Sequence, residues 1–69
     1  MLLTVECEQE TDGRWLAEVT QLPGVLAYGA TAQEAVSRAQ ILALRVVADR
    51  LEHGEAQPVD ITMTVADAA

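Results

Sequence analysis

The sequence contains little of several residue types whose presence would define a class of protein. It has one cysteine, Cys7, among 69 residues, which excludes an internal disulfide framework. No stretch approaches the roughly 18 consecutive apolar residues of a membrane-spanning helix. The amino terminus also has neither the basic segment nor the apolar run of a signal peptide. We therefore expect a soluble protein that is retained in the reducing cytoplasm and does not bind membranes.

Basic and aromatic residues are also scarce. Four basic residues stand against eleven acidic ones, which gives a net charge of −7. A phosphate backbone repels such a chain, and Trp15 and Tyr28 are too few aromatic residues for a surface on which bases stack. We therefore expect no direct binding of nucleic acid, whereas a basic protein would be attracted.

Most groupings of residues that form enzyme sites are missing as well. The sequence contains no glycine-rich phosphate loop, no metal-binding cluster of cysteine and histidine, and no triad of serine, histidine and aspartate. His53, the one histidine, falls in the last turn of a predicted helix, where a partial positive charge interacts favourably with the helix dipole. Cys7 alternates with polar residues and is expected to be a small core residue. We therefore expect no catalytic activity, no cofactor and no bound metal.

Alternation of apolar and polar residues predicts the strands, and a longer periodic segment predicts a helix. A three-residue hairpin loop at 11–13 places Cys7 opposite Ala17, so that the apolar side chains of both strands share one face. A two-residue loop would instead place Cys7 opposite Glu18, which disfavours it. The predicted elements are strands over about 2–10, 14–20, 25–29 and 59–65, a helix over about 32–52, and a tail at 67–69 that frays.

The order of three strands, one helix and one strand predicts a single α+β domain spanning residues 1–69. Because a helical crossover between parallel strands is right-handed, the last strand lies beside and parallel to the first, which gives the strand order 3-2-1-4. The helix covers one face of this four-stranded sheet. The other face is expected to be open and to contact a partner through Glu6, Glu8 and Glu18. Its full set of predicted side chains is Thr4, Glu6, Glu8, Leu16, Glu18, Leu26, Tyr28, Asp60 and Thr62.

The predicted helix has two apolar surfaces. The first consists of small residues and is expected to cover the sheet. The second is a strip formed by Ile41, Leu44, Ala48 and Leu51, and one sheet face cannot bury both surfaces. A second strip on a small domain indicates a contact with another chain, so we expect a homo-oligomer, a dimer or a tetramer. The alternative is that the segment before the last strand folds over the strip. The residues expected to cover the sheet are Ala32, Ala35, Val36, Ala39, Ala43, Val46 and Val47.

Local signals set the start of the helix and its charged face. Thr31 is the predicted N-cap, and Glu34 is expected to complete a capping box with it. A spacing of four residues predicts an ion pair between Glu34 and Arg38. The same spacing predicts a second ion pair between Arg45 and Asp49.

Three turn motifs follow one another between residues 12 and 35. They are Asp12-Gly13-Arg14-Trp15, Leu22-Pro23-Gly24 and Gly29-Ala30-Thr31-Ala32-Gln33-Glu34-Ala35. Together they resemble the HicB-like antitoxin family, whose N-terminal domain commonly carries the pattern DG-x-W-x-A-x-x-x-x-LPG-x-x-x-x-G-x-T-x-x-EA. Eleven positions of this chain fall on that pattern: Asp12, Gly13, Trp15, Ala17, Leu22, Pro23, Gly24, Gly29, Thr31, Glu34 and Ala35.

The resemblance implies a partial RNase H-like fold and a specific partner. HicB-like antitoxins bind and silence a small basic ribonuclease toxin of the HicA type, and the resemblance implies the same role here. Typical members continue into a module that binds the operator, and 69 residues leave no room for it, so we do not expect this chain alone to regulate an operon. The alternative is a stand-alone HicB-like interaction module with an unrelated partner.

The implied fold is shared with nucleases, which raises the question of catalysis. RNase H-like nucleases hold two metal ions between carboxylates that converge from strands and helix. The predicted register puts Glu6 and Glu8 on the face away from the helix, where Glu34 and Asp49 cannot join them. We therefore expect an acidic surface rather than a nuclease site.

Overall fold

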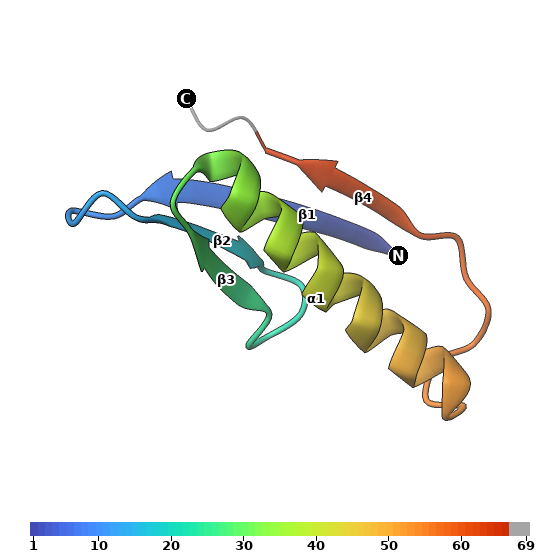
Figure 1. The fold of residues 1–69 in the computed structure, drawn as a ribbon. Coiled ribbons are helices and arrows are strands. Elements are labelled where there is room, and N and C mark those ends of the chain that lie inside the picture. Colours follow the sequence, from blue (N-terminus) through green and yellow to red (C-terminus); the bar gives the residue numbers. More distant parts are fainter. Residues whose placement is uncertain (67–69) are drawn as a thin grey trace.

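The structure, a computed structural model, describes residues 1–66, which form four strands and one helix (Figure 1). The elements are β1 (Leu2–Gln9), β2 (Trp15–Val19), β3 (Leu26–Gly29), α1 (Ala32–Glu52) and β4 (Thr62–Val65). The first three strands form an antiparallel meander, and β4 returns parallel to β1, so the sheet order is β3-β2-β1-β4. The predicted α+β class and strand order are confirmed. The fraying predicted for 67–69 lies outside the described residues.

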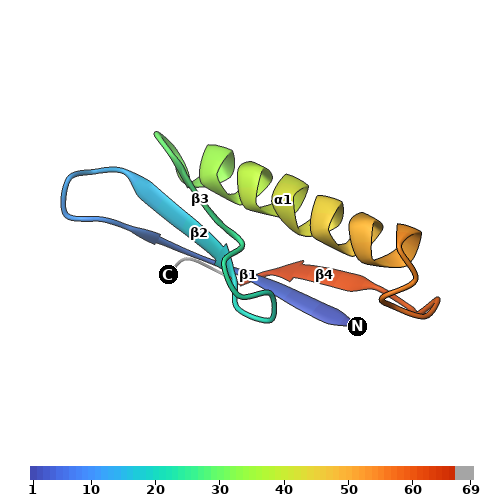
Figure 2. The ribbon, with the colours of Figure 1, turned by 90° about the horizontal axis from the view of Figure 1, so that it is seen from below.

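The domain has two layers, with α1 lying across one face of the sheet (Figure 2). Buried helix residues recur every four positions, and three of the four are alanine, so the helix axis can lie close to the strands. The predicted covering face is therefore confirmed. Within residues 1–66, no helix combines the length and apolar character that crossing a bilayer requires. The buried core consists of Leu3, Val5, Ala17, Val19, Leu22, Val25, Ala35, Ala39, Ala43 and Val47.

The hairpin between β1 and β2 fixes which side chains face the helix. Cys7 lies opposite Ala17, as the three-residue loop predicts. The backbone amide of Glu10 donates to the carbonyl of Arg14 at 2.7 Å, and the amide of Gly13 donates back to the carbonyl of Glu10 at 3.0 Å. Gly13 has a φ of +92°, a left-handed conformation that glycine adopts without strain. This loop therefore sets the register that sends the glutamates of both strands to the open face.

The last strand is shorter than the predicted range 59–65. β4 begins at Thr62 because its partner β1 begins opposite it, at Leu2. Before Thr62, the Asp60 carbonyl accepts a hydrogen bond from the Met1 amino group, but this single bond does not extend the ladder. Asp60, which was predicted to lie on the open face, belongs instead to the connection before β4. β1 and β3 differ from their predicted ranges by one residue at one end, and β2 is one residue shorter at each end.

The start of α1 is held by a cap and by a close approach to β3. The Thr31 Oγ1 atom accepts a hydrogen bond from the backbone amide of Glu34 at 3.1 Å. The Glu34 carboxylate pairs with Arg38 Nη2 at 2.9 Å, so the predicted ion pair is confirmed, but this carboxylate does not complete the capping box. A Cβ atom added at Gly29 would lie 2.6 Å from the backbone nitrogen of Ala35. The helix therefore rests directly against a glycine in β3.

The end of α1 differs from the prediction in one contact. His53 is the C-cap, and its backbone amide donates to the carbonyl of Asp49 at 3.0 Å. Its Nδ1 atom also lies 3.1 Å from a carboxylate oxygen of Asp49. The predicted ion pair between Arg45 and Asp49 is wrong, because the Asp49 side chain turns toward the helix terminus and contacts His53.

Candidate functional site

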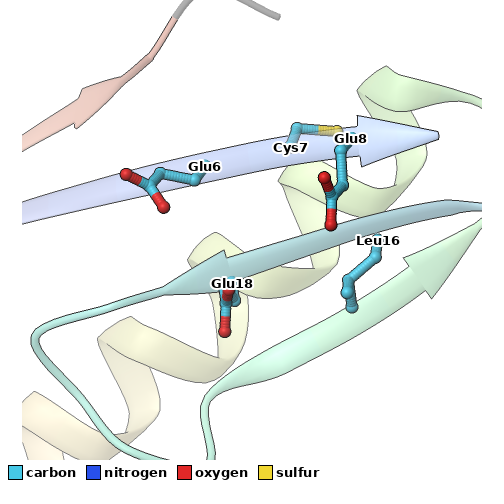
Figure 3. Close-up of a pocket in the computed structure, with 5 residues that line it drawn as sticks. All are labelled: Glu6, Cys7, Glu8, Leu16 and Glu18. Atoms are coloured by element: carbon cyan, nitrogen blue, oxygen red, sulfur yellow. The ribbon is translucent and has the colours of Figure 1, made fainter. Parts of the chain in front are cut away.

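The open face of the sheet carries a shallow depression lined by acidic side chains. Glu6 and Glu8 come from β1 and Glu18 comes from β2, and Figure 3 shows all three with α1 behind the strands. The depression has a volume of about 130 Å³, and Leu16 and Cys7 complete its lining. The structure therefore brings together the three glutamates that the sequence predicted for a partner contact.

The register places like charges next to one another on this face. Glu6 lies directly opposite Glu18, and Glu8 lies opposite Leu16. Side chains directly opposite on antiparallel strands have Cβ atoms about 5 Å apart, and like charges in that position destabilise the sheet. Among residues 1–66, none of the three glutamates forms an ion pair. The site therefore presents three uncompensated negative charges to solvent.

Apolar side chains flank the glutamates on the same face. Leu26 and Tyr28 of β3 are exposed, and Leu16 of β2 is half-buried. Leu2, at the start of β1, is also exposed on this face. A mixture of exposed apolar groups and charged groups is what a protein partner can bury, and the depression is too small to enclose a drug-sized molecule.

Cys7 lines the edge of the depression, yet its chemistry is that of a core residue. It is half-buried and packs against the hydrophobic core, as predicted. Burial raises the pKa of the Cys7 thiol, and the neighbouring charge of Glu8 raises it further. Because the thiolate is the reactive form of cysteine, a raised pKa makes Cys7 a poor nucleophile near neutral pH.

The second predicted surface, the strip on α1, is exposed. Ile41 is 49% exposed, Leu44 is 53% exposed and Leu51 is 39% exposed, and Ala48 is exposed between them. The alternative in which the segment before the last strand covers the strip is therefore wrong. An uncovered row of aliphatic side chains on one helix remains available to a second chain.

We expect the purified chain to form a dimer or larger species through this strip. The substitution Leu44→Glu should weaken the association by about tenfold or more, because the new carboxylate would be buried in an apolar contact. Sedimentation velocity over a micromolar concentration series measures the change. Gln33→Glu, which adds the same charge at an exposed position in the first turn of α1, is the matched control. A wild-type chain that stays monomeric at high concentration would contradict this prediction.

One group of possible metal ligands lies close together within residues 1–66. Ligand atoms of Asp49, Glu52 and His53 all come within 4.8 Å of one another, and all three residues are exposed. The His53 Nδ1 atom already lies 2.9 Å from the backbone carbonyl of Asp49. The three side chains are close because they lie in the last turn and C-cap of α1, where His53 contacts Asp49. The group lies outside the acidic depression.

Sequence reasoning missed a second concave surface, at the edge of the sheet. A groove of about 560 Å³ runs between β3 and α1. Arg38 and Arg45 lie seven residues, or about two turns, apart on one flank of the helix. This spacing is the signal in the sequence that could have indicated the groove. Its lining consists of Ala27, Tyr28, Arg38, Ile41, Leu42 and Arg45.

Comparisons with known proteins identify no family for this chain. No family model matches it, and neither a curated protein nor a solved structure is significantly similar to it.

Proposed function

We propose that this chain is a HicB-like antitoxin domain that binds and neutralises a small, basic, RNA-cleaving toxin of the HicA type in the cytoplasm. The observation that carries the proposal is the cluster of Glu6, Glu8 and Glu18 on an uncovered sheet face. Two of these glutamates oppose each other at a cost to the stability of the sheet. A cationic partner surface would remove that repulsion, so complex formation would turn an unfavourable contact into a favourable one.

The residues of the turn motifs support the proposal through the fold. Gly13 and Gly24 have positive φ values in the two turns of the meander, and Thr31 caps the helix. Gly29 lets the helix approach β3. The motif thus accounts for how the sheet is built, and the glutamates between its fixed positions supply the chemistry of the face.

The mode of neutralisation follows from the chemistry of the partner. An enzyme that cleaves RNA must attract a phosphate backbone with basic side chains. The three carboxylates would bind these side chains, and the flanking apolar groups of β2 and β3 would exclude water around them. RNA and this chain would then compete for one basic surface on the toxin, which blocks its active site.

Co-expression tests the proposal. Growth arrest caused by a small basic protein encoded beside this chain should be relieved when this chain is produced in the same cells. A frameshifted copy of the coding sequence, which yields the same transcript and no domain, is the control. Continued arrest with a soluble, folded chain would overturn the antitoxin proposal and favour an interaction module with an unrelated partner.

We also expect the chain to have no nuclease activity with magnesium or manganese. Glu6 and Glu8 lie on the open face, whereas α1, with Glu34 and Asp49, packs on the opposite face. Two-metal cleavage requires carboxylates that converge on one site. Incubation of a labelled RNA with the purified chain, beside Glu8→Gln purified identically, measures this. Cleavage that survives several columns and disappears in Glu8→Gln would contradict the expectation.

A further inference from the structure

The groove between β3 and α1 combines an apolar floor with basic side chains. Leu42 of the helix and Ala27 of the strand provide the apolar surface, together with Ile41, which the groove shares with the apolar strip of α1. Arg38 and Arg45 stand along the helix flank. The volume of about 560 Å³ is several times that of the acidic depression. β3 is the edge strand of the sheet, so within residues 1–66 no other strand pairs with its outer side.

The outer side of β3 exposes unpaired backbone groups. The amide of Val19 donates to the carbonyl of Val25 at 3.0 Å, which makes this pair a hydrogen-bonded one. Because bonded pairs alternate along an antiparallel ladder, Leu26 and Tyr28 direct their backbone groups outward. Arg38 confirms this direction, since its Nη1 atom donates to the outward carbonyl of Tyr28 at 2.9 Å. The Leu26 amide and carbonyl and the Tyr28 amide remain available to another strand.

Basic residues gather at this edge of an otherwise acidic domain. Three of the four basic residues of the chain lie here, since Arg14 also stacks 4.4 Å from the centre of the Tyr28 ring. Arg14 is held by Asp12, and the hydrogen bond from the Arg14 amide lowers the pKa of that carboxyl. Arg38 is paired with Glu34. Arg45 has no ion-pair partner within residues 1–66, although acidic residues outnumber basic ones in this chain.

We propose that this groove binds an extended, acidic segment of a partner protein, which adds to the outer side of β3 as a fifth strand. Strand addition would pair the free backbone groups of Leu26 and Tyr28, and a glutamate or aspartate of the segment would pair with Arg45. The partner proposed for this groove is acidic, whereas the partner proposed for the acidic face is basic. The inference therefore does not depend on the antitoxin proposal.

A second copy of the chain is the less suitable occupant of this groove. A symmetric pairing of two β3 strands is isologous, so it would bring Arg38 and Arg45 of both copies to the same contact. Like charges would then meet where the proposed segment supplies opposite ones. A segment in which acidic and apolar residues alternate fits better. Its acidic side chains would lie on the helix side of the sheet, and its apolar side chains would lie beside Leu26 and Tyr28 on the open face. Glutamates at alternate positions of the bound segment would be about 7 Å apart. Arg38 and Arg45 are about 10 Å apart along the helix. The long arginine and glutamate side chains can span this difference of about 3 Å.

The test is an NMR titration of the 15N-labelled chain with an end-blocked five-residue peptide of alternating valine and glutamate, with valine at both ends. We expect amide shift changes in β3 and in the 38–45 segment of α1, and none in β4. The same peptide with lysine in place of glutamate should produce no saturable shifts. A version with proline in place of the central valine should bind more weakly, because proline cannot donate a backbone hydrogen bond.

Two arginine variants make the test specific. Arg45→Ala should weaken binding of the glutamate peptide roughly fivefold, the upper end for an exposed ion pair. Arg50→Ala removes the same charge from an exposed position near the end of α1, outside the groove, and should leave the affinity unchanged. Equal binding of the lysine peptide, or equal weakening by both variants, would overturn the proposal. Shifts confined to the acidic face would also overturn it, as would amide shifts in β3 of the free chain that grow with its concentration, which would show that a second copy fills the groove.

Discussion

Gly29→Ala is expected to remove most of the stability of the domain. The added Cβ atom would lie 2.6 Å from the nitrogen of Ala35 and 3.0 Å from the Cβ atom of Glu34, so the first turn of α1 would have to move away from β3. Overpacking of this kind costs about 3 kcal/mol where the neighbour is backbone. A core in a chain of this size seldom provides more than about 5 kcal/mol of net stability. We therefore expect the midpoint of thermal unfolding to fall by about 15 °C.

Thermal unfolding followed by circular dichroism measures this effect. Gly54→Ala is the matched control, because an added Cβ atom at Gly54 meets nothing within 4 Å and the substitution only strains a backbone with a φ of +70°. That strain costs about 1 kcal/mol, so the control should lose much less stability than Gly29→Ala. Equal unfolding midpoints for Gly29→Ala and the wild type would show that the helix does not rest on β3 as described.

Replacing Glu6, Glu8 and Glu18 together with glutamine is expected to slow association with the proposed basic toxin roughly tenfold at low salt. The variant changes the net charge from −7 to −4 by removing the three uncompensated charges of the open face. Long-range attraction acts mainly on the association rate and is screened over about 8 Å at physiological ionic strength. The difference between variant and wild type should therefore shrink as salt is added. Stopped-flow fluorescence measures both rates.

The fold of this variant should be at least as stable as that of the wild type, because the repulsion between Glu6 and Glu18 is removed. The control changes the same number of charges elsewhere, with Glu52→Gln, Glu55→Gln and Asp60→Asn. It should associate nearly as fast as the wild type. If both triple variants slow association equally, net charge and not the open face controls the encounter.

Much of the fold could be predicted because local chemistry determines it. The glycine of the hairpin loop fixes one register, and that register alone brings Cys7 opposite Ala17. The row of alanine and valine residues on the helix identifies the face that covers the sheet. The same register places Glu6, Glu8 and Glu18 on the open face. These predictions are confirmed because each needs only the residues of neighbouring elements.

Other features depend on contacts between elements that are distant in the sequence. The start of β4 is set by where β1 begins. The strand is therefore shorter than the segment 59–65 over which apolar and polar residues alternate. Asp49 pairs with His53, although spacing alone allows Arg45 equally well. The groove along β3 arises only when the helix lies across the sheet at one position. The toxin partner and the homo-oligomer stay predictions, because they concern contacts of this chain with a partner or with a second copy of itself.

Inhibition of RNA cleavage in a purified system tests the antitoxin proposal most directly. A small basic protein encoded beside this chain, the proposed toxin, would be incubated with a labelled RNA while this chain is added in increasing amounts. We predict that cleavage falls steadily and stops when the chain reaches a fixed stoichiometric ratio to the toxin. At an intermediate amount of chain, the triple glutamine variant should inhibit less than the wild type. Undiminished cleavage in the presence of excess folded chain would contradict the proposed function.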